Sequence, residues 1–429
     1  MENSVKNLIQ FIDHSPSCFH VIENAKKQFL EHGFIQLEEK EHWNLEEGKS
    51  YFVERNGSSM IAFHLPKKDF QGFHIVASHS DSPTYRIKEQ PEMSVEKHYT
   101  KLNIERYGGM IPETWFDRPL SVAGRIIIEE NGQIKDQLVN IDRDLMIIPN
   151  LAIHMSRSSN ESKQLNPQKD LLPLCGGNLT KDGFEEMIAK ESGVEKEDIL
   201  SYDLFLYNRM RGTTLGINEE FVAAPKLDDL ECAYSSIEGI LNAKLSKDYV
   251  TVCAVFDNEE VGSGTKQGAG STFFPEVLKR ISYLCGKNEE EYYMAVADSF
   301  MLSADNAHAV HPNYQDKTDP TNRPYINEGI VLKYNASQKY TTDANSAALV
   351  KYLCKKEKIK CQVFFNRSDM LGGSTLGNIL TGQVSIKAAD IGLPQLSMHS
   401  TYETAGCKDL DDMITLMGSF YELGKEVQI

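Results

Sequence analysis

Dense runs of apolar residues that end in polar side chains recur along this chain. The densest covers residues 251–256, TVCAVF, and leads directly into four polar residues at 257–260. A second run, residues 73–78, leads into three polar residues at 79–81. Such runs predict strands buried on both faces, as in a parallel sheet covered by helices. Ligands collect at the carboxyl ends of such strands, so the polar residues mark the expected site.

Apolar residues at helical spacing predict helices between these runs. One helix is expected at residues 5–12, a second between Ser15-Pro16 and Gly33, and a third from about residue 230 to residue 244. Further strands are expected at residues 293–299, 362–365 and 395–400. Strands and helices that alternate in this way predict the α/β fold class, with a sheet flanked by helices.

The segment from residue 88 to residue 224 has a different character. It has few helical patterns, an Asn131-Gly132 hairpin signal between two strand-like runs, and an alternating pattern at residues 201–208. We therefore expect a β-rich domain inserted into an α/β domain. The two segments of the α/β domain, residues 1–87 and 225–429, would close into one sheet.

Composition narrows the class of protein. The 429 residues suggest two or three domains, with 41% hydrophobic residues and 25% charged residues, as in a soluble globular protein. The net charge of −17 argues against nucleic acids and anionic membranes as partners. Eight scattered cysteines with no C-x-x-C pair, no secretory signal and no long apolar stretch predict a cytoplasmic protein with reduced thiols.

Metal-binding residue types occur at several of the predicted strand ends. They are His79, Glu259, Glu260, Asp305 and His399, and Asp228 precedes the third helix. Each could alone be a turn residue, a helix cap or a core histidine. Separate structural roles do not explain why these types gather at one end of the sheet.

The residue types of this set indicate which metal it would bind. Histidines and carboxylates without cysteine suit zinc, with cobalt or manganese as alternatives. Five ligands exceed the needs of one catalytic zinc, so two divalent ions that share a carboxylate fit the set better. Asp81, two residues after His79, is expected to accept the other imidazole N–H and orient the ring.

Motifs at these positions carry a resemblance to a known family. They are HSDSP at 79–83, LDD at 227–229, FDNEEVGS at 256–263, SADNAHAVHPNY at 303–314 and QLSMHS at 395–400. In this order they resemble the active-site motifs of aspartyl aminopeptidases, co-catalytic zinc enzymes that form tetrahedral particles. Other similar stretches extend the resemblance over essentially the whole chain. It implies a zinc-peptidase-like mixed sheet, an inserted assembly domain and a dodecamer built from dimers.

The resemblance also implies roles for individual residues. One metal ion would be held by His79, Asp228 and Asp305, and the other by Asp228, Glu260 and His399. Glu259 would be the general base that activates water for cleavage of N-terminal residues from peptides. Family members commonly have Arg and Asn where this chain has Lys226 and Asp229.

Two more residues gain a role only through the resemblance. Lys333, in GIVLKYN, matches the position that meets the side chain of an N-terminal Asp or Glu. His154, in LAIHMSR, matches a histidine that reaches the active site of a neighbouring subunit. Without the resemblance, Lys333 is better explained as a solvated lysine and His154 as a structural histidine.

Other functions are also consistent with parts of the sequence. The glycine-rich segment 261–271 could indicate a phosphate-binding module, although Gln267 stands where G-x-G-x-x-G needs its third glycine. A carboxypeptidase or deacylase would use the same metals on a different bond. A non-catalytic assembly protein would not need Glu259.

Overall fold

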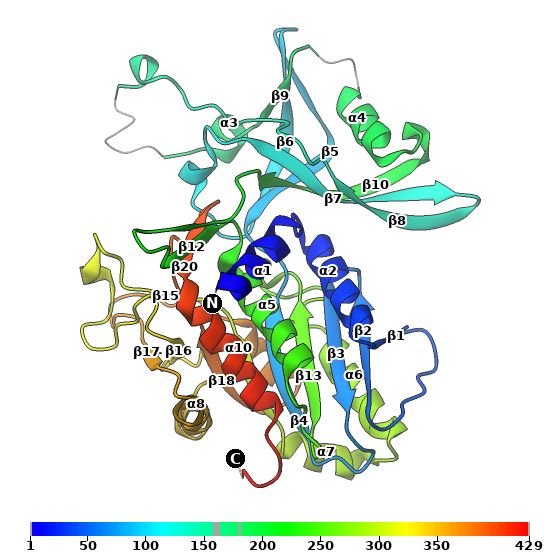
Figure 1. Cartoon of the computed structure of the whole chain (residues 1–429). Coiled ribbons are helices and arrows are strands. Elements are labelled where there is room, and N and C mark those ends of the chain that lie inside the picture. The colour runs from blue at the N-terminus through cyan, green and yellow to red at the C-terminus, as the bar shows by residue number, and fades with distance from the viewer. Residues whose placement is uncertain (1, 158–163, 179–181, 428–429) are drawn as a thin grey trace.

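The computed structural model describes residues 2–157, 164–178 and 182–427. Its largest sheet has nine strands in the order β1-β2-β3-β13-β4-β14-β18-β16-β17 (Figure 1). In that order the strands span Ile35–Leu37, Lys49–Arg55, Ser59–Leu65, Val250–Phe256, Phe73–His79, Phe300–Ala304, Lys387–Gly392, Ile330–Lys333 and Cys361–Phe364. β13 runs parallel to β4 but antiparallel to β3, so the sheet is mixed, as expected.

Helices cover both faces of this sheet. The helices on one face are α1 (Glu2–Asp13), α2 (Cys18–Glu31), α5 (Leu227–Asn242), α8 (Ala344–Glu357) and α10 (Cys407–Tyr421). Those on the other face are α6 (Phe273–Leu284), α7 (Glu289–Ala297) and α9 (Leu376–Gln383). Along β13, Cys253 and Val255 join the first core, whereas Val252 and Ala254 join the second. The strand predicted at residues 251–256 is therefore confirmed as buried on both faces.

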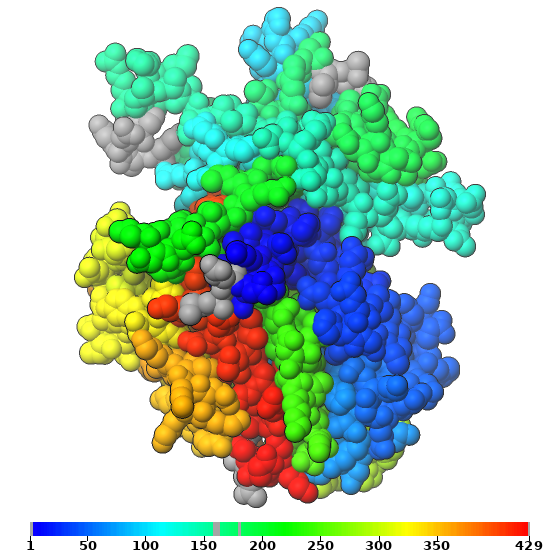
Figure 2. All heavy atoms as spheres, in the orientation of Figure 1, coloured from blue at the N-terminus to red at the C-terminus, as the bar shows by residue number. Residues whose placement is uncertain are grey.

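A second sheet forms a separate layer above the first (Figure 1). It has six strands in the order β8-β7-β10-β5-β6-β9, which span Gln133–Asn140, Leu120–Glu130, Ile199–Asn208, Thr84–Val95, Tyr99–Tyr107 and Leu174–Gly176. α3 (Pro167–Asp170) and α4 (Gly183–Ser192) belong to the same stretch of chain. The sheet has its own apolar core, in which Trp115 and Leu204 are buried. Figure 2 shows this part as a lobe resting on the larger α/β body.

A third sheet joins segments that are far apart in the sequence. Its order is β11-β12-β20-β19-β15, with strands at Thr213–Leu215, Phe221–Ala224, Glu403–Gly406, Pro394–Leu396 and Ala307–His308. Residues 213–224 of the expected insertion thus pair with the C-terminal segment, and β5 begins at Thr84. The division into domains at residues 87 and 224 stays a prediction.

One predicted strand is wrong, and the strand expected at residues 395–400 is shorter than predicted, because β19 ends at Leu396 and residues 397–400 form a turn. Residues 293–297 form the second half of α7, and the strand begins only at Phe300. Asn288 and Glu291 form a capping box that starts this helix, and Tyr292, Ala295 and Val296 are buried at helical spacing. The apolar run at residues 293–297 was read as a strand, but the capping signal before it makes it helical. None of the described helices is long and apolar enough to cross a membrane.

Candidate active site

The strand order of the large sheet brings the predicted metal ligands together. β4 lies between β13 and β14 and runs parallel to both, so all three strands end at the same edge. His79 is the last residue of β4, and Asp305 follows β14 directly. Glu259 and Glu260 open a short 3-10 helix, η4 (Glu259–Val261), three residues after β13. The polar residues that follow these strands therefore face one site.

Two further ligands come from outside these strands. Asp228 is near the start of α5, where its backbone is not helical and its peptide bond to Asp229 is cis. His399 follows β19 and has a positive φ of 67°. Asp228 Oδ1 lies 3.7 Å from His79 Nε2, and Asp228 Oδ2 lies 3.2 Å from His399 Nε2. Asp228 thus lies between the two imidazoles.

All five predicted metal ligands lie in two adjoining groups. In one group, single ligand atoms of His79, Asp228, Asp229 and Asp305 lie within 4.8 Å of one another. In the other, those of Asp228, Glu260 and His399 do so. Glu259 completes a further group with His79 and Glu260. All of these residues except Asp229 line a cavity of about 280 Å³.

The electrostatics of the cluster favour a bound cation. Burial raises the pKa of Glu259 to about 8 and holds that of Glu260 well above its ordinary value. Asp228 Oδ1, Asp229 Oδ1 and Glu260 Oε1 are buried without a hydrogen-bond partner. Buried carboxylate oxygens without partners are costly, and divalent cations would compensate their charge. The histidine and carboxylate donors therefore fit zinc.

Asp229 was not among the predicted ligands, although the adjacent acids of LDD could have drawn attention to it. Its Oδ2 accepts a hydrogen bond of 3.0 Å from the His79 backbone N–H. Burial raises the pKa of Asp229 well above its ordinary value. Its observed contact thus holds the end of β4 in place.

Glu403 holds two ligands by their backbone and was also not predicted. It is the buried first residue of β20. Its two oxygens accept hydrogen bonds from the backbone N–H groups of Asp228, at 2.9 Å, and of His399, at 2.6 Å. No residue of the QLSMHS motif indicates this partner, because the contact depends on β20 lying next to β12.

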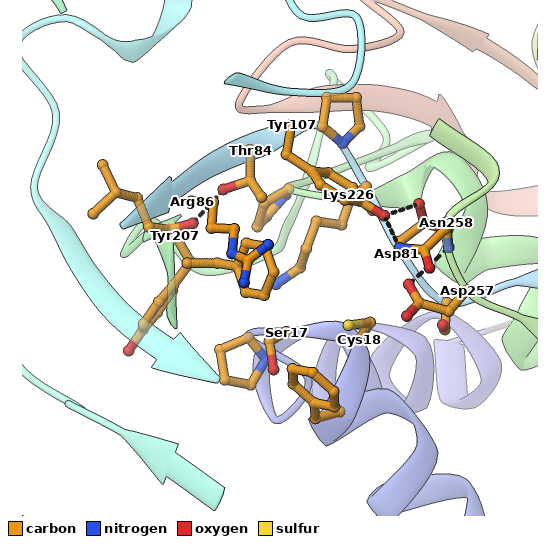
Figure 3. Close-up of a pocket in the computed structure, with 18 of the residues that line it drawn as sticks. Ser17, Cys18, Asp81, Thr84, Arg86, Tyr107, Tyr207, Lys226, Asp257 and Asn258 are labelled. Atoms are coloured by element: carbon orange, nitrogen blue, oxygen red, sulfur yellow. Dashed lines mark hydrogen bonds between the residues drawn. The ribbon is translucent and has the colours of Figure 1, made fainter. Parts of the chain in front are cut away.

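Asp81 makes more contacts than its expected one with His79. Its Oδ1 lies 3.3 Å from His79 Nδ1, whose nearest acceptor is the Asp81 carbonyl at 3.1 Å. The carboxylate also accepts the backbone N–H groups of Glu259 and Glu260, both at 3.1 Å. Tyr107, from the six-stranded sheet, donates its hydroxyl to Asp81 at 2.6 Å (Figure 3). Asp81 therefore joins the ends of β4 and β13 to the upper lobe.

Lys333 and His154 lie in contrasting places. Lys333 ends β16, lines the same cavity as the cluster and is only 2% exposed, so it is not a solvated lysine. Its Nζ donates to the backbone carbonyls of Asp305 and Asn306 at 2.7 and 3.3 Å. His154 lies in an exposed 3-10 turn (Ile153–Met155) of the upper lobe, away from the cluster of its own chain.

The remaining cavity wall includes residues that the motifs did not single out. His308, Tyr340 and Phe364 line it, and the rings of His308 and Phe364 pack edge to face.

The glycine-rich segment 261–271 forms a compact loop. A Cβ on Gly268 would lie 2.5 Å from the carbonyl oxygen of Ser263, so the glycine allows the loop to fold back on itself.

A mixed α/β sheet with a buried histidine–carboxylate cluster at its strand ends defines a metal-dependent hydrolase. Comparison with known proteins identifies the family. The profile described as Aminopeptidase I zinc metalloprotease (M18) matches residues 11–421. The chain belongs to this M18 family, so it is a zinc-dependent aminopeptidase, as the motifs predicted.

Relatives and solved structures agree with this assignment. A probable M18 family aminopeptidase 2 of Clostridium acetobutylicum is 45% identical, over 97% of this chain and 98% of the relative. One of Pseudomonas aeruginosa is 37% identical, over 97% of each chain. Ape4, solved by cryo-EM with Nbr1, matches with a TM-score of 0.95 and 36% identity, over 98% of this chain and 85% of that one. Yeast aminopeptidase 1 matches with a TM-score of 0.87 and 28% identity, over 98% and 97%.

We expect Asp81→Asn to reduce activity or zinc affinity by about 10- to 100-fold, because an amide cannot accept all the hydrogen bonds that this carboxylate receives. The measurements are kcat/KM after reconstitution with zinc and the zinc content of the purified variant. Asp316→Asn, at an exposed position, is the matched control. Wild-type values for both quantities in Asp81→Asn would show that these contacts do not matter.

Proposed function

We propose that this chain removes acidic residues from the N-termini of peptides with a two-metal centre. The position of Asp228 carries the proposal, because its two oxygens face two different histidines. A carboxylate placed in this way can bridge two ions. His79, Asp228 and Asp305 would hold one ion, and Asp228, Glu260 and His399 the other. The same donors would also accept cobalt or manganese.

When bound, zinc would polarise the scissile carbonyl of the substrate and lower the pKa of a bound water. Among the described carboxylates that line the cavity of the cluster, Glu259 is the one not assigned as a ligand. It lies at the start of η4, and its backbone is held by Asp81. Its role would be to accept the proton of the attacking water and to deliver a proton to the leaving amine.

Lys333 would select the acidic side chain of the substrate. Burial opposes its charge, but Asp305 offsets this and the pKa of Lys333 lies above its ordinary value, so the ammonium stays charged. Two backbone carbonyls accept hydrogen bonds from it, and Asp305 Oδ2 lies 3.6 Å from its Nζ. Its third N–H would turn to a substrate carboxylate when the metal ion holds Asp305. A buried cation in the cavity wall supports a preference for Asp or Glu over neutral residues.

Assembly would complete the site. The mApe1 of S. cerevisiae, which is 26% identical with a TM-score of 0.85, was solved as a dodecamer. The exposed apolar residues Leu151, Ile153 and Met155 beside His154 are suited to contact another subunit. We propose a homododecamer of dimers in which His154 contributes to a neighbouring site. All eight cysteines are free thiols, which supports a cytoplasmic location.

Glu259→Gln should lower kcat by about 10²- to 10⁴-fold, because the amide cannot accept a proton. Zinc content should stay unchanged, since the residue is not a ligand. Glu290→Gln, in the exposed first turn of α7, controls for the substitution itself. Turnover near the wild-type rate in Glu259→Gln would contradict the role of general base.

Replacement of Lys333 by Met should lower kcat/KM for Asp and Glu substrates about 10- to 100-fold more than for Leu substrates, because only the acidic side chains lose a charged partner. A panel of aminoacyl anilides measures this ratio. Lys351→Met changes an exposed lysine and should leave the ratio unaltered. An equal loss for all substrates would mean that Lys333 only supports the structure.

Co-assembly of two weak variants tests the role of His154. If His154 acts in a neighbouring site, a working site needs an intact Glu259 from its own subunit and an intact His154 from the neighbour. When equal amounts of Glu259→Gln and His154→Ala subunits assemble at random, about a quarter of the sites meet both conditions. Activity of particles purified after co-expression is the measurement. Particles that combine Glu259→Gln with the Glu259→Gln/His154→Ala double variant are the control. Activity no higher than that of the separate variants would place His154 outside the neighbouring site.

A further inference from the structure

A second cavity, of about 240 Å³, lies behind the metal cluster. It is lined from the α/β body by residues 16–19 and 225–226, and from the upper lobe by residues 84–86 and 203–208. Asp81 also lines it, and Asp228 lines both this cavity and the one that contains Lys333. Figure 3 shows its walls, with Tyr107 and Asp81 on one side and the start of α2 on the other.

The walls of this cavity are largely apolar and aromatic. Phe19, Trp115, Phe205 and Tyr207 contribute rings, and Pro16, Pro83 and Pro225 contribute further apolar surface. Apolar walls with few polar groups are typical of sites for small organic ligands.

The acidic residues that line the cavity are engaged with other groups. The two oxygens of Asp228 face the imidazoles of His79 and His399, and Glu403 accepts hydrogen bonds from the backbone N–H groups of Asp228 and His399. Asp81 accepts hydrogen bonds from Tyr107 and from two backbone N–H groups. Asp257 accepts them from the Asn258 backbone at 2.7 Å and from the Gln267 amide at 3.3 Å. Asp203 forms ion pairs with Arg86 at 2.8 Å and Arg125 at 2.9 Å. These acids therefore do not call for a cationic ligand.

Lys226 is the exception among the charged groups. Its side chain is partly buried and extends into the cavity (Figure 3). No acidic oxygen of the described residues forms an ion pair with its ammonium group, although the Asp13 carboxylate, beyond ion-pair distance, favours its charge. Its backbone is left-handed, with a φ of 59°. Low-dielectric surroundings make a cation without a partner unfavourable, so an anion in the cavity would be stabilised.

The start of α2 gives the same end of the cavity a second feature that favours anions. α2 has 14 residues, and its cap residue Ser17 makes no side-chain cap hydrogen bond. The Ser17 hydroxyl contacts His20 Nδ1 at 2.8 Å instead. Ser17, Cys18 and Phe19 all line the cavity, so the positive end of the helix dipole opens onto it.

We propose that this cavity binds a small organic monocarboxylate with an apolar body, separately from the peptide substrate. The carboxylate would lie between the Lys226 ammonium and the start of α2, and the body would contact the aromatic walls. One unpaired ammonium suits a single negative charge, whereas a phosphate would leave further charge against apolar rings. Because the two cavities share only Asp228 among their described lining residues, ligand and substrate would occupy them at the same time.

Calorimetry on the zinc-loaded wild-type enzyme, with 4-bromobenzoate as the probe, tests this site. A saturating amino-acid hydroxamate occupies the metal centre, so any heat of binding that remains cannot come from probe bound to the metals. We expect binding to persist under these conditions and 4-bromobenzamide, the uncharged analogue, to bind roughly tenfold more weakly or worse. Loss of binding with hydroxamate, equal binding of the amide, or no binding up to about 10 mM would overturn the proposal.

Variants of Lys226 locate the charge that is responsible. Lys226→Met should weaken probe binding by roughly tenfold or more, and Lys226→Arg should retain it. The matched control is Lys247→Met, an exposed lysine beyond the other end of α5. Unchanged binding in Lys226→Met would overturn the site.

A crystal of the wild-type enzyme with the same probe gives a result that does not depend on any variant folding. Anomalous scattering should place bromine among Phe19, Phe205 and Tyr207. Bromine only at the metals or on the outer surface would overturn the proposal. Both experiments measure binding alone, so their outcome is independent of peptide specificity.

Discussion

The carboxylate of Asp228, buried between two imidazoles, is the contact on which the site depends. Each of its oxygens faces a different histidine, and further acids surround it. Withdrawing a carboxylate from water costs of the order of several kcal/mol unless a positive charge compensates it. Burial raises the pKa of Glu260 and of Asp229 for this reason. The fold thus gathers a negative charge that bound zinc would neutralise.

Neighbouring acids hold the ligands by their backbones. Glu403 accepts the N–H groups of Asp228 and His399, and Asp229 accepts that of His79. Asp81 does the same for the two residues at the start of η4. Each of these backbone segments is therefore fixed by a buried hydrogen bond to a carboxylate. Hydrogen bonds to a charged group are stronger than those between neutral groups. Precise placement of metal ligands usually needs such surrounding contacts.

The upper lobe contributes to the centre through Tyr107, which donates to Asp81 and accepts from the Asn258 amide at 2.8 Å. The six-stranded sheet therefore helps to build the centre, because one of its side chains contacts the residue that holds η4. The cavity with Lys226 lies at this same junction of the two lobes. Contacts between lobes and contacts within the active site are made by the same few residues.

The sequence alone was sufficient for the class of fold, the buried central strand and the family, and it singled out five candidate ligands that the structure brings into one cluster. Apolar runs identify buried strands because a two-sided sheet excludes polar side chains, and the motifs identify ligands because metal binding restricts residue types. The segment at residues 293–297 was misread because a short apolar run suits a helix as well as a strand. Only its capping box distinguishes the two.

Tertiary structure decided what depends on residues far apart in the chain. Long-range hydrogen bonds give three residues their roles: Glu403, Asp229 and Tyr107. Their partners lie up to 175 residues away in the sequence, so a local sequence pattern cannot predict these contacts. The burial of Lys333, and the lack of an ion pair for Lys226 within the described part of the chain, follow from packing in the same way. Residue types and their spacing in the sequence indicate that metal binding and proton transfer are possible. The contacts between individual oxygen and nitrogen atoms of the site depend on how the strands pair in the sheet.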